Sequence, residues 1–124
     1  MGDNDSAISD NEFIDHSNEI TFHPSHPYYL SPSDNPGLML VAKQFNGTCF
    51  GAWRRAIIIV LSTKKKIGFI NGSFPQPAPT SPLLDQWEQV NHMVISWILN
   101  SLDPEIAQSL IFTKTAKGIW DELN

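Results

Sequence analysis

Large hydrophobic side chains recur at helical spacing in two long segments of the chain. The first segment spans residues 49–65, and its apolar stripe is typical of an amphipathic helix. Four consecutive β-branched residues, 57–60, make a strand the competing interpretation. The length of the segment favours the helix, and Thr48 is expected to cap its N-terminus. The stripe consists of Phe50, Trp53, Ile57, Val60 or Leu61, and Lys64.

The second segment holds a stripe over about 18 residues. We expect Ser81 to be its N-cap and Pro82 its first helical position, since proline suits the first turn of a helix. The stripe consists of Leu83 or Leu84, Trp87, Val90, Met93 or Val94, Trp97 or Ile98, and Ser101 or Leu102.

Two shorter helices are expected near the C-terminus. The sequence Asp103-Pro104-Glu105 ends the second helix and begins a third, which extends to about Phe112. Thr115 is expected to cap a fourth helix over residues 116–123. The side chains predicted to point inward are Ile106, Leu110 and Ile111 in the third helix, and Ile119, Trp120 and Leu123 in the fourth.

Prolines and turn-forming residues separate these helices. Four prolines between residues 67 and 82 predict a loop, because proline cannot donate a backbone hydrogen bond. Tight turns are expected at residues 35–37 and at Asn46-Gly47, and residues 38–41 form an extended arm or a short strand. The predicted fold class is all-α, a small bundle of about four helices with a Pro-rich extended arm.

The N-terminal part of the chain differs in composition from the rest. Asn, Asp, Ser and Glu dominate residues 1–26, and the few apolar residues there follow no sustained period. Such a segment cannot bury enough apolar surface to offset its conformational entropy. We therefore predict a disordered acidic tail over residues 1–26 and one helical domain over residues 27–124.

Composition excludes several classes of protein. The 124 residues are 41% hydrophobic, with a net charge of −5 that comes from the first 42 residues, which contain no Lys or Arg. The single cysteine, Cys49, allows neither an internal disulfide nor a Cys-based zinc site. No long apolar run or signal sequence is present, so we expect no membrane partner and a cytoplasmic or nuclear location. No arrangement of residues suggests catalysis, a cofactor, a metal or a small-molecule substrate.

The basic residues suggest nucleic acid as a candidate partner. All eight lie after residue 42, so the predicted helical domain is mildly basic. The lysine cluster is expected to be a solvated helix end, and one of the two arginines is expected to pair with a carboxylate such as Glu88. So few charges would give weak, salt-sensitive binding. The candidate contacts are Arg54, Arg55, Lys64, Lys65 and Lys66.

The tryptophans lie on the predicted helical stripes, which favours packing in a core or interface over stacking on bases. They are Trp53, Trp87, Trp97 and Trp120.

An ordered series of motifs resembles the N-terminal region of plant copia-type LTR retrotransposon gag polyproteins. The resemblance extends from about Ser25 to the C-terminus. The series is His26-Pro27-Tyr28-Tyr29-Leu30, Ser33-Asp34-Asn35-Pro36-Gly37, Phe50 to Ala56, Ile67 to Ser73, Trp87, Asn91 to Ser101, and Thr115 to Trp120.

This resemblance implies structural work rather than catalysis. Gag chains of that family associate with one another into virus-like particles around RNA, so the implied partners are this chain itself or full-length gag. The family's gag continues into a second helical part and a zinc knuckle, so we expect this chain to be a fragment of a gag, resembling its leading, capsid-like module. A weak, sequence-independent nucleic-acid-binding module is the alternative.

Overall fold

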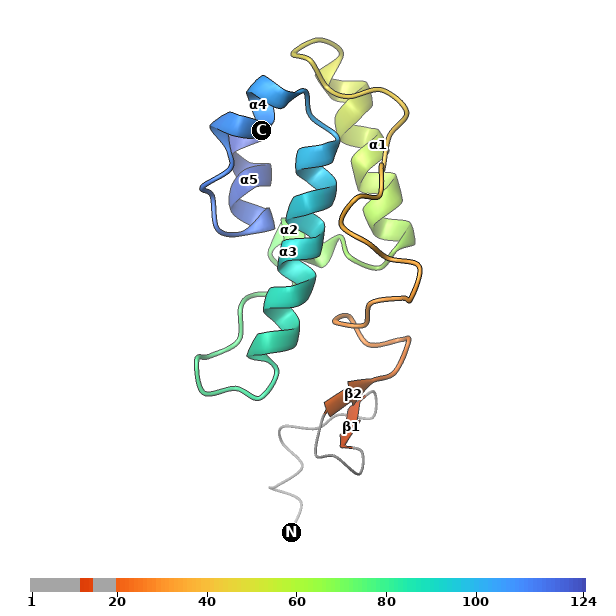
Figure 1. Ribbon diagram of the computed structural model, residues 1–124, viewed down its shortest axis with the longest axis vertical. Coiled ribbons are helices and arrows are strands. Elements are labelled where there is room, and N and C mark those ends of the chain that lie inside the picture. The colour runs from red at the N-terminus through yellow and green to blue at the C-terminus, as the bar shows by residue number, and fades with distance from the viewer. Residues whose placement is uncertain (1–11, 15–19) are drawn as a thin grey trace.

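The computed structural model describes residues 12–14 and 20–124, which are mostly helical, as predicted. A small antiparallel hairpin precedes the helices, with Glu12 opposite Phe22. Within the described residues the elements are β1 (Glu12–Ile14), β2 (Ile20–Phe22), α1 (Phe50–Thr63), α2 (Gly68–Asn71), α3 (Leu84–Asn100), α4 (Pro104–Ser109) and α5 (Ala116–Leu123). Figure 1 shows α3 at the centre, with α1 on one side and α4 and α5 on the other.

The core forms where the predicted stripes meet. In α1 the buried side chains are Trp53, Ile57 and Leu61, spaced four residues apart. α3 adds Val90 and Trp97, both with no exposed surface. The strand alternative for residues 57–60 is wrong, because these residues lie within α1.

The predicted cap of α1 is wrong. The N-cap is Cys49, which adopts a left-handed backbone (φ 58°) and makes no capping hydrogen bond with its side chain. The Thr48 hydroxyl instead donates to Asn46 Oδ1 at 2.8 Å, within the turn that precedes the helix. The hydroxyl is thus engaged before the helix begins.

The predicted start of α3 is also wrong by two residues. The helix begins at Leu84 after an N-cap, Leu83, without a side-chain cap bond. Ser81 and Pro82 belong to a preceding turn, in which the Ser81 hydroxyl accepts from the Leu83 amide and the Ser81 carbonyl from the Leu84 amide.

The predicted loop over residues 67–82 contains a short helix. α2 buries Gly68, Phe69 and Ile70 and ends at Asn71, and its C-cap Gly72 has a left-handed φ of 88°, which suits glycine. The Gly68 backbone lies so close to the Phe74 ring that an added Cβ would be 2.4 Å from it. The prolines that follow dominate the sequence pattern and conceal this single turn.

The two C-terminal helices start where predicted. Asp103 accepts a hydrogen bond from the Ile106 amide, and Thr115 accepts one from the Gly118 amide. The third helix, however, is shorter than expected, since α4 ends at Ser109. Ile111 is 52% exposed rather than inward. Leu110 is the buried residue at this helix end, and the chain turns outward after it.

The segment from residue 23 to residue 48, called the arm below, contains no helix or strand. It runs alongside α1 and α3 in space. Just before α1 begins, a parallel bridge between Phe45 and Leu102 joins the arm to the segment after α3. The turn at residues 35–37 is confirmed by the hydrogen bond from the Leu38 amide to the Asn35 carbonyl. At Asn46-Gly47 the glycine has φ 103°, as such a turn requires.

Part of the predicted tail falls outside the described residues, namely 1–11 and 15–19. The structure does describe residues 12–14 and 20–26, which belong to the predicted tail and precede the expected start of the helical domain at residue 27. His26 is 7% exposed, and its ring lies 4.8 Å from that of Phe22 and 5.1 Å from that of Tyr28. This aromatic cluster joins the hairpin to the arm.

Candidate functional site

The C-terminal end of α1 is the first place where charged side chains gather. Lys64 Nζ lies 3.1 Å from Asp34 Oδ1 and 4.9 Å from the centre of the Trp97 ring. Asp34 also accepts a hydrogen bond from the Ser31 amide at 3.0 Å. Lys64 is therefore held by an acid of the arm and an aromatic ring of α3.

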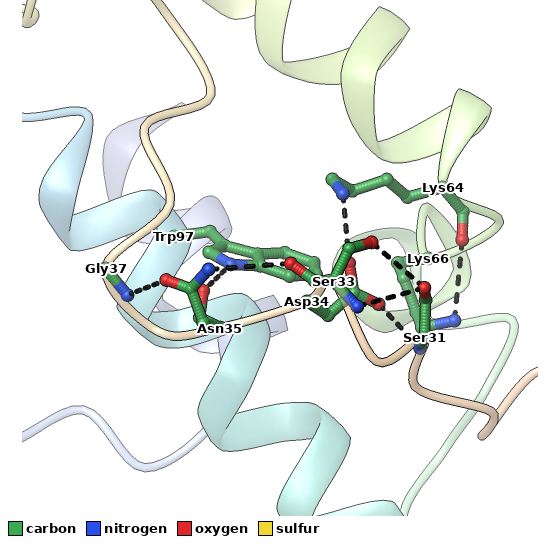
Figure 2. A network of polar contacts seen from close by, with 8 residues as sticks. All are labelled: Ser31, Ser33, Asp34, Asn35, Gly37, Lys64, Lys66 and Trp97. Atoms are coloured by element: carbon green, nitrogen blue, oxygen red, sulfur yellow. Dashed lines mark hydrogen bonds and ion pairs between the residues drawn. The ribbon is translucent and has the colours of Figure 1, made fainter.

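The arm is fastened to α3 in the same place (Figure 2). Trp97 Nε1 donates to the Asn35 carbonyl at 2.8 Å, and Asn35 Oδ1 accepts from the Gly37 amide at 3.0 Å. Asn100 Nδ2 donates to the Pro36 carbonyl at 2.7 Å. The bonds from Trp97 and Asn100 join the arm to α3, and the ion pair between Asp34 and Lys64 joins it to the C-cap of α1.

The chain leaves α1 through a left-handed turn at Lys65, with φ 61°. The Lys66 amide donates to the Leu61 carbonyl and the Lys65 amide to the Ser62 carbonyl, at 2.8 and 3.0 Å. This is a Schellman motif, which usually has glycine at the left-handed position. The turn directs the chain back toward the body of the protein.

As a result Lys66 is buried, with 4% of its surface exposed. Its Nζ donates to the Lys64 carbonyl at 3.4 Å. Desolvation lowers the pKa of Lys66 below 10.5, Asp34 opposes that shift, and Lys64 and Lys65 add to it. The prediction of a solvated helix end is therefore wrong for Lys66 and holds only for the exposed Lys65.

The two arginines lie far from the lysines. Arg54 and Arg55 are exposed near the start of α1, and ten residues of helix, about 15 Å, separate Arg54 from Lys64. Arg54 Nε donates to Asn124 Oδ1 at 2.6 Å, and its guanidinium lies 5.7 Å from the centre of the Trp120 ring. Within the described residues, Arg54 pairs with the C-terminal residue and not with Glu88. The predicted basic contacts do not form one surface.

All four tryptophans are buried, between 0% and 7% exposed. Trp53 Nε1 donates to the Ser101 carbonyl, and Trp87 Nε1 donates to the Phe74 carbonyl. The Trp53 and Trp120 rings lie 5.8 Å apart. The four tryptophan rings pack in the interior of the protein, so stacking on nucleic-acid bases would require the core to open.

An exposed apolar ridge lies between α4 and α5. Phe112 is 92% exposed and its neighbour Ile111 is 52% exposed; these two residues are called the ridge below. Ile111 lines two hollows, one of about 540 Å³ beside Leu99 and Ala107, and one of about 480 Å³ beside Ile95. The ridge thus stands between two hollows on the surface of α3. The sequence Leu110-Ile111-Phe112 carries a signal for this, since three consecutive side chains at a helix end cannot all point inward.

Asn91 is a buried polar residue that the pattern analysis missed. It is 2% exposed, its Nδ2 donates to the Lys114 carbonyl, and its Oδ1 accepts from the Ala116 amide. It holds the start of α5 against α3, and so positions the loop that carries the ridge.

The described part of the chain contains neither a group of metal-ligating side chains nor a helix suited to cross a membrane. There, no three His, Cys, Asp or Glu side chains gather as metal ligands would. None of the described helices combines the length and hydropathy needed to cross a bilayer.

Residues 31–78 match the family described as Gag-polypeptide of LTR copia-type. The matched segment contains most of the arm, α1 and α2, including the contact between Asp34 and Lys64. Neither a curated protein nor a solved structure matches this chain. The resemblance expected from the motifs is therefore confirmed over this segment.

Proposed function

We propose, from the premise that residues 31–78 identify a copia-type gag segment, that this chain is a non-enzymatic structural module of a retrotransposon gag. In this proposal it associates with copies of itself, or with full-length gag chains, through the ridge and the adjacent face of α3. No residue is assigned a catalytic step.

The exposure of Phe112 carries the proposal. Burying an exposed phenylalanine gains about 1.5–3 kcal/mol, so a side chain 92% exposed is a strong candidate for an interface. The hollow beside Leu99 and Ala107 lies next to the ridge on the same molecule. Two copies related by a two-fold axis could therefore each insert Phe112 into the hollow of the other.

The test compares Phe112→Ser with Ile59→Ser, which removes a half-exposed apolar side chain from α1 instead. We expect the first variant to weaken self-association about tenfold or more, and the second to leave it unchanged. Sedimentation velocity over a range of protein concentrations measures this. Equal effects of the two substitutions would contradict a role for the ridge.

The nucleic-acid alternative has less support. Lys64 is engaged by Asp34, Lys66 is buried, and Arg54 is held by Asn124. The exposed charges that remain near these sites would neutralise few phosphates, so binding to RNA would be weak and would disappear as salt rises.

A further inference from the structure

A small polar hollow lies where the arm meets the end of α1. Its volume is about 160 Å³, roughly ten times the volume that one water molecule needs by this kind of measure. It therefore suits a group of a few heavy atoms. Among the residues that line it are Ser31, Ser33, Asp34, Lys64, Lys65 and Lys66.

Lys66 is the unexplained residue of this hollow. A buried ammonium group is costly unless it is well paired, and it offers three hydrogen-bond donors. Only 4% of the surface of Lys66 is exposed. Within the described residues its Nζ nevertheless makes one hydrogen bond, 3.4 Å long, to the Lys64 carbonyl. That distance is beyond the usual range for a strong bond. The described residues therefore leave most of the donor capacity of Lys66 unused.

The charges around the hollow leave a positive excess. Asp34 is the carboxylate among the lining residues, and its two oxygens accept from Lys64 Nζ and from the Ser31 amide. Asp34 pairs directly with Lys64 and also attracts Lys66, but three lysines face this one carboxylate, so the lining keeps a positive excess. The Ser31 and Ser33 hydroxyls lie 3.0 Å apart beside them, and because one donates to the other, the pair keeps one hydroxyl proton for an anion.

We propose that this hollow binds a small phosphate-type oxyanion, either inorganic phosphate or the phosphate group of a small monoester. Lys66 supplies the buried cation, Lys65 a second positive charge at the rim, and the hydrogen-bonded pair of serine hydroxyls one neutral donor. Such charge-assisted hydrogen bonds are stronger than neutral ones. The bound oxyanion would give Lys66 strong hydrogen-bond acceptors and would add a contact between the arm and the C-terminal end of α1.

The geometry favours a small anion over a polymer. The three lysines surround one hollow of about 160 Å³ instead of lining an open groove. The nearest arginine of the same helix, Arg55, lies nine residues before Lys64, about 14 Å along the axis. A nucleic-acid backbone would need its phosphates to be met in succession along a surface.

The test is a nuclear magnetic resonance titration of the full chain with inorganic phosphate, matched in ionic strength with sodium chloride. We expect saturable shifts centred on residues 29–34 and 64–66. Lys66→Met should weaken this binding about tenfold, whereas Lys43→Met, which removes an exposed lysine elsewhere, should not change it. Ser33→Ala, a mild change at an exposed position, should weaken binding about threefold and provides a second test if Lys66→Met does not fold.

Two results would overturn the proposal. One is the absence of saturable shifts with phosphate in the unmodified chain. The other is an equal loss of binding in Lys43→Met and Lys66→Met, which would indicate diffuse attraction by net charge. In a further arm, a single-stranded RNA is added in place of phosphate; Lys66-dependent binding of the RNA without binding of phosphate would also contradict a small-anion site.

Discussion

Lys66 illustrates how a single backbone angle changes the role of a side chain. Three consecutive lysines after an amphipathic stripe indicate a solvated helix end, and that is the usual outcome. Here Lys65 adopts the left-handed conformation, so the next residue returns to the protein body and is buried. Nothing in the sequence marks this turn, because the position that normally carries glycine carries lysine.

The lowered pKa of Lys66 predicts how stability depends on pH. Burial makes the charged form unfavourable in the folded state, so between the lowered pKa and 10.5 the unfolded chain binds more protons and stability rises with pH. We expect Lys66→Met to stabilise the protein at about pH 7 in phosphate-free buffer, and this advantage to shrink towards about pH 10. Urea unfolding at the two pH values, with Lys43→Met as control, measures the difference. An advantage that is the same at both pH values would contradict the assignment.

A second prediction concerns the strain at Lys65. For residues other than glycine, the left-handed backbone conformation costs about 1–2 kcal/mol of conformational free energy. The free energy of unfolding of Lys65→Gly should therefore be about 1 kcal/mol higher than that of Lys65→Ala. The two variants remove the same charge, and their comparison isolates the backbone. Thermal or urea unfolding provides the value. Equal stabilities would mean that the turn relaxes at no cost.

At the level of elements, the sequence predicts the position of a helix most accurately where its hydrophobic stripe is long. α1 and α3 lie where the spacing of Trp53, Ile57, Trp87 and Trp97 places them. The predicted cap Thr115 is confirmed, because its side chain is free to turn toward α5 and accepts from the Gly118 amide. Thr48, in contrast, is engaged in the preceding turn, and α2 is too short to produce a period.

The contact between α3 and α5 gives a prediction of its own. Asn91→Ala leaves the Ala116 amide and the Lys114 carbonyl without their partner, so we expect a loss of about 2–4 kcal/mol in the free energy of unfolding. The neighbouring His92 is exposed, and His92→Ala should change stability by less than about 0.5 kcal/mol. Denaturant unfolding of the pair tests this. Similar stabilities of the two variants would show that water replaces the amide without cost.

For the molecule as a whole, the sequence predicts the mostly helical fold and the likeness of residues 31–78 to copia-type gag, but not the candidate sites. Asp34 and Lys64 are thirty positions apart, and no local pattern indicates that they meet. Of the ridge, Ile111 is the residue predicted to point inward, because a helix that extends to Phe112 would bury it. Both sites depend on where helices end, which is the least regular part of a sequence pattern.

The central claim is that the exposed apolar surface serves association between copies of this chain. The most direct test is the molar mass of the purified chain, treated with ribonuclease, measured by light scattering from about 10 to about 500 µM, with and without added RNA. The claim predicts a mass that rises from 13.9 kDa to at least twice that value as concentration increases, without RNA. A mass that stays at 13.9 kDa throughout, or that rises only when RNA is added, would contradict it.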